Sequence, residues 1–442
     1  MTIVAPKEAT LLGLARTLLL LRDHVRPNVS DATLAEALLG TRVALVGDSA
    51  NLCSEQAQHA LVATAMLAAR SGASVHLVLP DVPLSGSQPP LRGDQLGPVL
   101  LEVLADLIPG VVGAVGVPVG GVDLAILIGD TSWSDRATRV LRLQSDAWSG
   151  AITSGSGSGG RWTDSGSPFG ALAAAGLAAG EAFKAALGRL RDYAINWTAF
   201  DLLFAPTREA IVELAPARTP SPTGDLGAFD CISGGAIVQA ALYALARIPG
   251  ARGAVRIVEP DVSDMTNLNR NALLRRSRIG MAKAVDLAEM QLGEMRVTPI
   301  VARYDSALRS SFGQHAPSVL VGVDDIPTRW EVQAARPSWL GVGATTHYSA
   351  MASYHVSGLG CARCLHPRDE PGGAPIPTVG FVSHWAGLWL ASLFARERIG
   401  ARPPAVKQCL YFTSLRADSP AAIWVGPVQP RADCPLKCAT WK

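Results

Sequence analysis

The strongest constraint on the fold is that one order of predicted elements occurs twice along the 442-residue chain. In the first half, an apolar strand at 42–48 precedes an alanine-rich helical stretch and a second strand at 73–81. In the second half, the strand 229–235, the helix 236–248 and the strand 254–261 follow in the same order. Nearly continuous apolar strands that alternate with helices are typical of parallel sheets covered by helices. The sequence therefore predicts an α/β protein built from two doubly wound units.

Later segments extend the repeat. In chain order, the pairs are VDLAILIGD (122–130) with SVLVGVDD (318–325), AWSGAITSGS (147–156) with SWLGVGATTH (338–347), and PFGALAAAGLAAGEAFKAAL (168–187) with TVGFVSHWAGLWLASLFARE (378–397). A Pro-, Gly- and Ser-rich stretch at 215–227 predicts a linker. We therefore expect two tandem Rossmann-like domains, at 1–214 and 228–442. Only the second copy contains a polar insert and paired cysteines, which indicates one active and one supporting half.

Composition excludes several classes of partner. A net charge of +2 with 17% charged residues favours neither nucleic acid nor an anionic membrane surface. The longest apolar run, 111–129, contains Asp123 and Pro118 and predicts two short segments around a turn rather than a membrane helix. The start of the chain lacks the basic and apolar parts of a secretory signal. We therefore expect a cytoplasmic protein.

Charged and polar residues gather after the strands of the second copy. Glu259 ends a strand, Asn267 and Arg270 follow it, Lys283 comes thirteen positions after Arg270, and Asp324 ends another strand. In an open parallel sheet, ligands bind beyond the carboxyl ends of the strands. The two cations are suited to phosphates, the strand-end acid to a ribose hydroxyl, and Asp324 to a magnesium ion. This pattern predicts a site for a nucleotide triphosphate.

Four of the seven cysteines form two close pairs. They are Cys361 with Cys364 in CARC, and Cys434 with Cys438 in CPLKC. In a cytoplasmic protein such pairs favour metal over disulfide. Thiolates at this spacing suit a tetrahedral zinc ion, so the sequence predicts one structural zinc site.

The second half resembles the ubiquitin-activating-enzyme-like superfamily of ThiF, MoeB and HesA adenylating enzymes. The resemblance rests on Glu259, the run NLNR at 267–270, Lys283, Asp324 and the cysteine pairs. It covers about 228–442, and the first half more weakly, as a degenerate, inactive copy.

The resemblance implies a reaction and its cofactors. ATP with magnesium would adenylate the C-terminal carboxylate of a small ubiquitin-like or sulfur-carrier protein. Arg270 and Lys283 would neutralise phosphates, Asn267 would help to hold phosphate or metal, and Asp324 would hold magnesium. Gly235 would lie in the phosphate turn and Glu259 against the ribose. A downstream conjugating or sulfur-transfer protein would receive the product, and a homodimer is also compatible with the family.

The sequence departs from the family pattern in its glycine-rich turn. The turn aligns with SGGAIV at 233–238, so only Gly235 of three glycines remains. Ser233 stands at the tight turn, and Val238 stands where the helix packs closely on the strand.

A second departure concerns the nucleophile. Thioester-forming members have a cysteine in the crossover segment, but here residues 365–383 contain none. Cys53, Cys231 and Cys409 are expected to be structural. We therefore predict an adenylating enzyme without the crossover cysteine.

Bacterial relatives often supply an arginine to the triphosphate from an N-terminal helix of the partner chain. In this chain the first copy would supply it, with Arg22 preferred over Arg16. Two alternatives to carrier activation are an enzyme that adenylates a ribosomally made peptide, and a scaffold that keeps the fold without turnover. A nicotinamide dehydrogenase is disfavoured, because NLNR and the cysteine pairs have no role in it.

Overall fold

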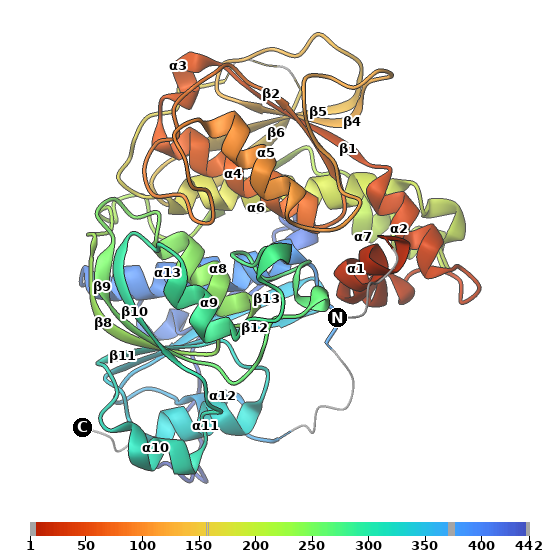
Figure 1. The fold of residues 1–442 in the computed structure, drawn as a ribbon. Helices are drawn as coiled ribbons and strands as arrows, with labels where there is room; N and C mark the ends of the chain where they lie inside the picture. The colour runs from red at the N-terminus through yellow and green to blue at the C-terminus, as the bar shows by residue number, and fades with distance from the viewer. Residues whose placement is uncertain (1–5, 156, 158, 370–375, 439–442) are drawn as a thin grey trace.

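Two β-sheets face each other across paired layers of helices (Figure 1). The computed structural model describes residues 6–155, 157, 159–369 and 376–438. Further short helices cover the outer face of the second sheet (Figure 1). The chain is therefore an α/β protein, as the alternating pattern predicts.

The first half forms a seven-stranded sheet of order β3-β2-β1-β4-β5-β6-β7. Strands β3 to β5 in this order are parallel, whereas β6 and β7 each run antiparallel to their preceding neighbour. The strands are β1 Arg42–Gly47, β2 Ser74–Val78, β3 Gly113–Val115, β4 Val122–Ile128, β5 Ala137–Ser145, β6 Ser149–Ser154 and β7 Glu209–Glu213. The helices are α1 Pro6–Arg22, α2 Asp31–Leu39, α3 Ser49–Leu52, α4 Glu55–Arg70, α5 Leu96–Ala105, α6 Phe169–Gly188, η1 Arg191–Tyr193 and α7 Trp197–Phe204.

The second half forms an eight-stranded sheet of order β10-β9-β8-β11-β12-β13-β14-β15. Its strands are β8 Asp225–Ile232, β9 Arg252–Val258, β10 Glu294–Ile300, β11 Ser318–Val321, β12 Trp339–Thr346, β13 Ser349–His355, β14 Cys409–Thr413 and β15 Ile423–Gly426. Its helices are α8 Ala236–Leu245, η2 Met265–Asn267, η3 Arg276–Arg278, α9 Lys283–Glu289, α10 Ser306–Phe312, α11 Ile326–Ala334, α12 Ala362–Leu365, α13 Gly380–Arg398, η4 Ala405–Lys407 and η5 Ser414–Arg416. In each half the parallel strands have the order 3-2-1-4-5 that is typical of Rossmann folds.

The repeat is confirmed, but one predicted pairing is wrong. Segment 147–156 contains β6, which runs antiparallel, whereas 338–347 contains β12, which is parallel to β11. By position in the sheets, β12 corresponds to β5, and β13 corresponds to β6. The error arose because apolar content identifies a buried strand but carries no information about its direction.

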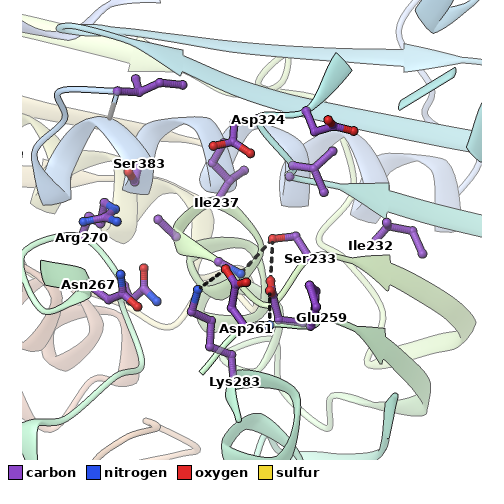
Figure 2. Close-up of a pocket in the computed structure, with 18 of the residues that line it drawn as sticks. Ile232, Ser233, Ile237, Glu259, Asp261, Asn267, Arg270, Lys283, Asp324 and Ser383 are labelled. Carbon is purple, nitrogen blue, oxygen red and sulfur yellow. Dashed lines mark hydrogen bonds and ion pairs between the residues drawn. The ribbon is translucent and has the colours of Figure 1, made fainter. Parts of the chain in front are cut away.

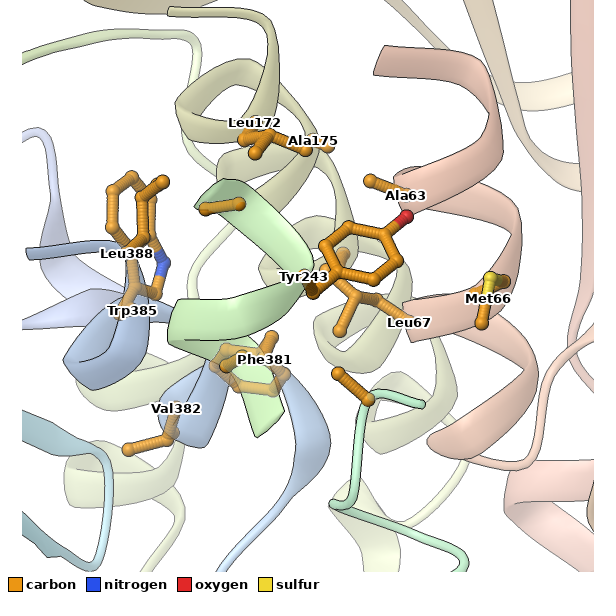
Figure 3. Close-up of a cluster of buried hydrophobic side chains, with 14 of the residues drawn as sticks. Ala63, Met66, Leu67, Leu172, Ala175, Tyr243, Phe381, Val382, Trp385 and Leu388 are labelled. Atoms are coloured by element: carbon orange, nitrogen blue, oxygen red, sulfur yellow. The ribbon is translucent and has the colours of Figure 1, made fainter. Parts of the chain in front are cut away.

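The two halves share one hydrophobic core. Helices α4 and α6 of the first half pack with α8 and α13 of the second (Figure 3). The approach is so close that a Cβ atom on Gly176 would lie 2.8 Å from the ring of Trp385. Helix α6 has the length and composition of a membrane span, but 94% of that window is buried inside the protein. The helix is therefore accounted for as a core element.

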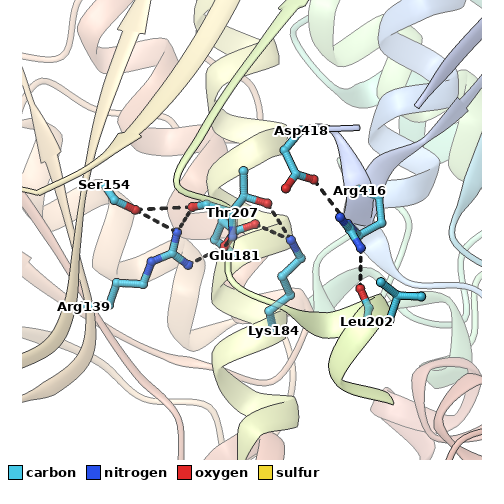
Figure 4. Close-up of polar contacts among 8 residues, drawn as sticks. All are labelled: Arg139, Ser154, Glu181, Lys184, Leu202, Thr207, Arg416 and Asp418. Carbon is cyan, nitrogen blue, oxygen red and sulfur yellow. Dashed lines mark hydrogen bonds and ion pairs between the residues drawn. The ribbon is translucent and has the colours of Figure 1, made fainter. Parts of the chain in front are cut away.

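A buried charge network joins α6 to the sheet of the first half (Figure 4). The Glu181 carboxylate forms an ion pair with Lys184 at 2.7 Å and another with Arg139. It also accepts a hydrogen bond of 3.0 Å from the backbone N–H of Thr207. Lys184 donates a second hydrogen bond, to Thr207 Oγ1, at 2.8 Å. Because each of the three charges has an opposite partner and a hydrogen bond, the network tolerates burial.

The predicted linker 215–227 overlaps the segment between β7 and β8. Strand β8 begins inside it, at Asp225. The indole N–H of Trp148 donates to the carbonyls of Thr219 and Pro220, at 3.2 and 3.1 Å. This segment is therefore tied to the first half at its centre.

Candidate nucleotide site and cysteine cluster

A cavity of about 690 Å³ lies beyond the carboxyl ends of β8, β9, β11 and β12 (Figure 2). The residues that the sequence assigned to a nucleotide in the second half all line it: Gly235, Glu259, Asn267, Arg270, Lys283 and Asp324. They come from separate turns and loops that only the folded sheet brings together. The place agrees with the general rule for ligand sites in open α/β sheets.

The turn after β8 forms although it lacks two glycines. Ser233 has a φ of +120°, a value that side-chain-bearing residues rarely adopt. The strained serine is held by its hydroxyl, which accepts from the Gly235 N–H at 2.9 Å and donates to Glu259 at 3.3 Å. A Cβ atom on Gly235 would meet only Ser233 Oγ, at 3.0 Å. The turn at Gly235 therefore remains open toward the cavity.

The bulk of Val238 is accommodated by a glycine on the neighbouring strand end. A Cβ atom on Gly322, just after β11, would lie 3.0 Å from Val238 Cγ2 and 3.2 Å from Ile237 Cβ. Helix α8 therefore approaches the sheet closely without a third glycine in the turn. The glycine that permits this close packing thus stands after β11 rather than on α8.

Glu259 and Lys283 both have partners within the site. The buried Glu259 carboxylate accepts hydrogen bonds from the backbone N–H groups of Gly234 at 2.6 Å and Asp261 at 3.0 Å. Lys283 Nζ forms an ion pair with Asp261 at 3.0 Å. Glu259 therefore braces the turn, and Asp261 is an additional acid at the cavity wall.

Two arginines from different halves of the chain meet at one wall. Burial and, to a smaller extent, the charge of Arg16 lower the pKa of Arg270 to about 10, whereas Asp264 and Asp324 oppose the shift. Arg270 donates to Asn269 Oδ1 at 3.1 Å and to the carbonyl of Thr266. Among the described residues, neither guanidinium forms an ion pair with a carboxylate. This wall is therefore suited to an anion.

Arg22, the arginine preferred from sequence, lies elsewhere. It forms an ion pair with Asp31 at 2.6 Å and donates to the carbonyl of Val29 at 2.7 Å. Six residues make about one and two-thirds turns of helix, so Arg16 and Arg22 point to different sides of α1. Arg16 is the residue of α1 that lines the cavity.

Two buried polar atoms at the cavity have no partner among the described residues. They are the side-chain nitrogen of Asn271 and the hydroxyl of Thr378. Both residues line the cavity and are at least 95% buried. Buried polar groups are usually hydrogen-bonded, so a polar ligand or water is expected to complete them.

Asp324 presents its carboxylate at the end of β11 (Figure 2). Arg329 lies beneath it and donates to the carbonyl of Val323 at 3.1 and 2.7 Å and to His366 at 3.0 Å. Burial lowers the pKa of Arg329 to about 10, while Asp324 and Asp325 oppose the shift. This arginine fixes the strand end that carries the exposed acid.

Strand β1 of the first half corresponds to β8, and side chains fill the space beyond its end. Asp48 caps α3 after β1, and the Asn51 side chain donates to it at 2.9 Å. The Asn51 side-chain oxygen accepts from the N–H of Trp162 at 2.9 Å, and a Cβ atom on Gly129 would lie 2.1 Å from Asn51. A packed helix and loop thus occupy the place that the turn at 233–235 leaves open in the second half.

The four paired cysteines form one buried cluster. The Sγ atoms of Cys361, Cys364, Cys434 and Cys438 all lie within 4.8 Å of one another. Neighbouring sulfurs are 3.5 to 3.7 Å apart. A tetrahedral zinc ion with Zn–S bonds of about 2.3 Å requires sulfurs about 3.8 Å apart. The cluster therefore fits a zinc ion.

Backbone N–H groups donate hydrogen bonds to sulfur atoms of the cluster. Burial raises the pKa of Cys361, and it raises that of Cys438 to about 11, whereas hydrogen bonds from the N–H groups of Cys438 and Leu436 outweigh burial at Cys434 and lower its pKa to about 7. The N–H of Arg431 donates to Cys364 Sγ at 3.3 Å. Thiolates are the form that binds metal.

The remaining cysteines lie away from the cavity wall. Burial raises the pKa of Cys231 strongly and that of Cys409 to about 12. Cys53 is exposed, but it follows α3 in the first half. The predicted crossover segment 365–383 includes 370–375, which lie outside the described residues.

Sequence reasoning missed several residues of the cavity: Asp261, Asn271, Arg329 and Thr378. Two of them could have been identified from the sequence. Asp261 belongs to the same strand-end run as Glu259, and Asn271 directly follows the NLNR motif. Arg329 and Thr378 could not, because they reach the cavity only through the packing of α11 and of the segment before α13.

Comparison with known proteins gives a family match within the first half. Residues 42–199 match the family model described as the BilD N-terminal domain. The chain is 27% identical over 256 residues to the uncharacterized protein y4jF of Sinorhizobium fredii, in an alignment that covers 55% of this chain and 46% of that protein. The chain thus spans about half the length of this curated relative. Residues 42–199 are similar to BilD N-terminal domains, and the residues that line the cavity lie outside this range.

Proposed function

We propose that the chain binds ATP in this cavity and adenylates the C-terminal carboxylate of a small ubiquitin-like or sulfur-carrier protein, in a bacterial-type conjugation or sulfur-transfer pathway. One observation carries the proposal. Six residues chosen from the sequence for nucleotide chemistry converge on one cavity, and two arginines without a carboxylate partner among the described residues meet at its wall. Two neighbouring arginines without carboxylate partners suit the phosphates of a nucleotide.

The reaction asks little covalent chemistry of the protein. A carboxylate oxygen of the carrier attacks the α-phosphorus of ATP, the bond from this phosphorus to the bridging oxygen breaks, and pyrophosphate leaves. Arg270 and Arg16 neutralise phosphate oxygens as charge shifts to the leaving group, and Lys283 adds a third cation. Preorganised charge in a partly dry site is usually the largest catalytic term.

Asp324 fits a magnesium ion that accompanies the nucleotide, whereas its neighbour Asp325 caps α11 and pairs with Arg303. Carboxylate oxygens are the protein ligands that magnesium prefers, and Asp324 is exposed at the cavity with no hydrogen bond to the described residues. Bound there, the ion would spread the negative charge of the phosphates. Arg329 keeps the strand end in place for it.

The activated product leaves as the acyl-adenylate. A thioester requires a thiolate within about 3 to 3.5 Å of the acyl carbon. Cys231 and Cys409 are buried with raised pKa values, and Cys53 belongs to the other half. The acyl group is therefore handed directly to a thiol or an amine of a downstream protein.

The test is carrier-dependent exchange between ATP and labelled pyrophosphate with the full chain. Asp324→Ala is expected to lower the exchange rate at least about 100-fold, because the phosphate charge loses its metal. Asp130→Ala is the matched control, since Asp130 follows the equivalent strand β4 of the first half, and this variant is expected to keep the exchange. Full exchange by Asp324→Ala would refute the site. A thiol-sensitive carrier adduct on a non-reducing gel would refute direct hand-over.

A further inference from the structure

A loop of the cavity is held from the opposite half of the molecule. Residues 267–274 carry Asn267, Arg270 and Asn271, which all line the cavity. The end of this loop lies against α4, whose last residue is Arg70. The Arg70 side chain is fully buried and points across the boundary between the halves.

The Arg70 guanidinium binds three backbone carbonyls of that loop. It donates to Leu268 at 2.6 Å, to Ala272 at 3.0 Å and to Leu274 at 2.7 Å. These carbonyls flank Arg270 on both sides in the chain. A planar guanidinium with five donors can reach three acceptors at once, which a lysine ammonium on a flexible stem does not reproduce.

Helix α1 of the first half also holds the loop. The side-chain nitrogen of Asn269 donates to Thr17 Oγ1 at 2.9 Å and to the carbonyl of Thr378 at 3.0 Å. Arg16, the neighbour of Thr17, lines the cavity. The first half therefore fixes the loop at two points, through Arg70 and through Thr17.

A similar buried arginine reaches from the second half into the first half, away from the cavity. Arg247 follows α8, the helix that corresponds to α4, and is also buried. It donates to the carbonyl of Pro89 in the first half at 3.0 Å and stacks 3.4 Å over the ring of Tyr243. Each half thus inserts one buried arginine into a loop of the other. The loop that Arg247 holds lines a different hollow, at 84–93.

We propose that Arg70 is a positioning residue for the cavity, so that the half with a filled strand end acts as a built-in activator of the other half. Arg70 holds the loop carbonyls in register, and this register sets Asn267, Arg270 and Asn271 toward the phosphates. The consequence for catalysis rests on the proposed function. The effect on the loop is independent of it.

The first arm of the test measures loop order in the full chain. Hydrogen exchange by mass spectrometry is compared between Arg70→Lys and its matched control Arg247→Lys. Arg70→Lys is expected to speed exchange in 268–274 about tenfold, the effect of losing one well-formed hydrogen bond. The control is expected to leave this loop unchanged and to affect 84–93 instead. Unchanged protection of 268–274 in Arg70→Lys, or equal acceleration in both variants, overturns the proposal.

The second arm separates positioning from stability by steady-state kinetics at a temperature well below unfolding. Arg70→Lys is expected to raise the KM for ATP about tenfold and to lower kcat up to about 100-fold, because misplaced phosphate ligands weaken the transition state. The KM for the carrier and the kinetics of Arg247→Lys are expected to stay near wild type. Equal losses in both variants would show a structural role only. If the wild-type chain shows no exchange at all, the proposed function fails, while the hydrogen-exchange arm still decides whether Arg70 orders the loop.

Discussion

Removing the charge of Glu181 is expected to destabilise the whole protein. In Glu181→Gln the amide oxygen still accepts from Thr207 and Arg139, but the ammonium of Lys184 loses its counter-charge. The Lys184 side chain is only 2% exposed, so water cannot replace the carboxylate. Breaking a buried ion pair by removing one partner typically costs about 3–5 kcal/mol. The expected loss is at the lower end of this range, about 3 kcal/mol, because the charge of Asp418 still acts on Lys184 in the variant.

A double-mutant cycle tests this reasoning. Because the two halves share one core, we expect the chain to unfold as one unit, and for 442 residues a loss of 3 kcal/mol corresponds to a fall in Tm of about 3 °C. Lys184→Met alone is expected to cost less, since Glu181 keeps its pair with Arg139. Glu181→Gln combined with Lys184→Met is expected to recover most of the loss, because the fully buried ammonium is gone and the remaining charge, on Arg139, is 20% exposed and keeps the amide oxygen as an acceptor. Urea denaturation of the four proteins measures the cycle. A double variant less stable than Glu181→Gln would refute the account.

Three further predictions concern the turn, the cysteine cluster and acid stability. Ser233→Gly relieves backbone strain of about 1–3 kcal/mol but loses the hydroxyl contacts, so we expect its free energy of unfolding to change by less than about 1 kcal/mol. Ser233→Ala keeps the strain and loses the same contacts, and is expected to cost about 1–3 kcal/mol in urea denaturation. Equal effects of the two variants would contradict the strain at Ser233. Metal analysis is expected to find one zinc per chain, and chelation or Cys434→Ser is expected to lower Tm and expose the C-terminal segment to proteolysis. Burial lowers the pKa of His355 and of His384 to about 4, below the unfolded value of 6.5. Between these two values the unfolded state binds more protons than the folded state. The free energy of unfolding therefore falls as the pH drops through this window, by about 1.4 kcal/mol per pH unit for each histidine. Urea midpoints that stay constant from pH 7 to 5 would contradict the last prediction.

The sequence was informative about the fold wherever local periodicity decides the structure. Apolar strands and helices at matching spacing predicted both Rossmann-like halves, and the loop-borne polar motif predicted the wall of the cavity. The pairing of 147–156 with 338–347 failed because strand direction is set by neighbouring strands in the folded sheet. The choice of Arg22 failed for a related reason. The face of α1 that contacts the cavity depends on how this helix packs against η2, which no local pattern reveals.

The accommodation of the eroded glycine turn was also beyond the sequence. When the turn is considered alone, a valine at position 238 is expected to hinder the close packing of the helix on the strand. In the fold, Gly322 lies against Val238 from a strand eighty-odd positions away, and the strained Ser233 is held by its own hydroxyl. Compensation between distant positions is visible only when the packed structure brings them together.

The shared core gives a physical reason why a half with a filled strand end persists in this chain. Helices α8 and α13 of the second half bury Tyr243, Phe381 and Trp385 against α4 and α6 (Figure 3). Each large apolar side chain exposed by loss of the first half would cost about 1.5–3 kcal/mol, so these three alone approach the stability of a typical domain. We therefore expect the second half to depend on the first half for its stability, whatever role the cavity has. Once the first half is retained for packing, Arg16, Thr17 and Arg70 are held beside the loop that carries Arg270, where they can order one wall of the cavity.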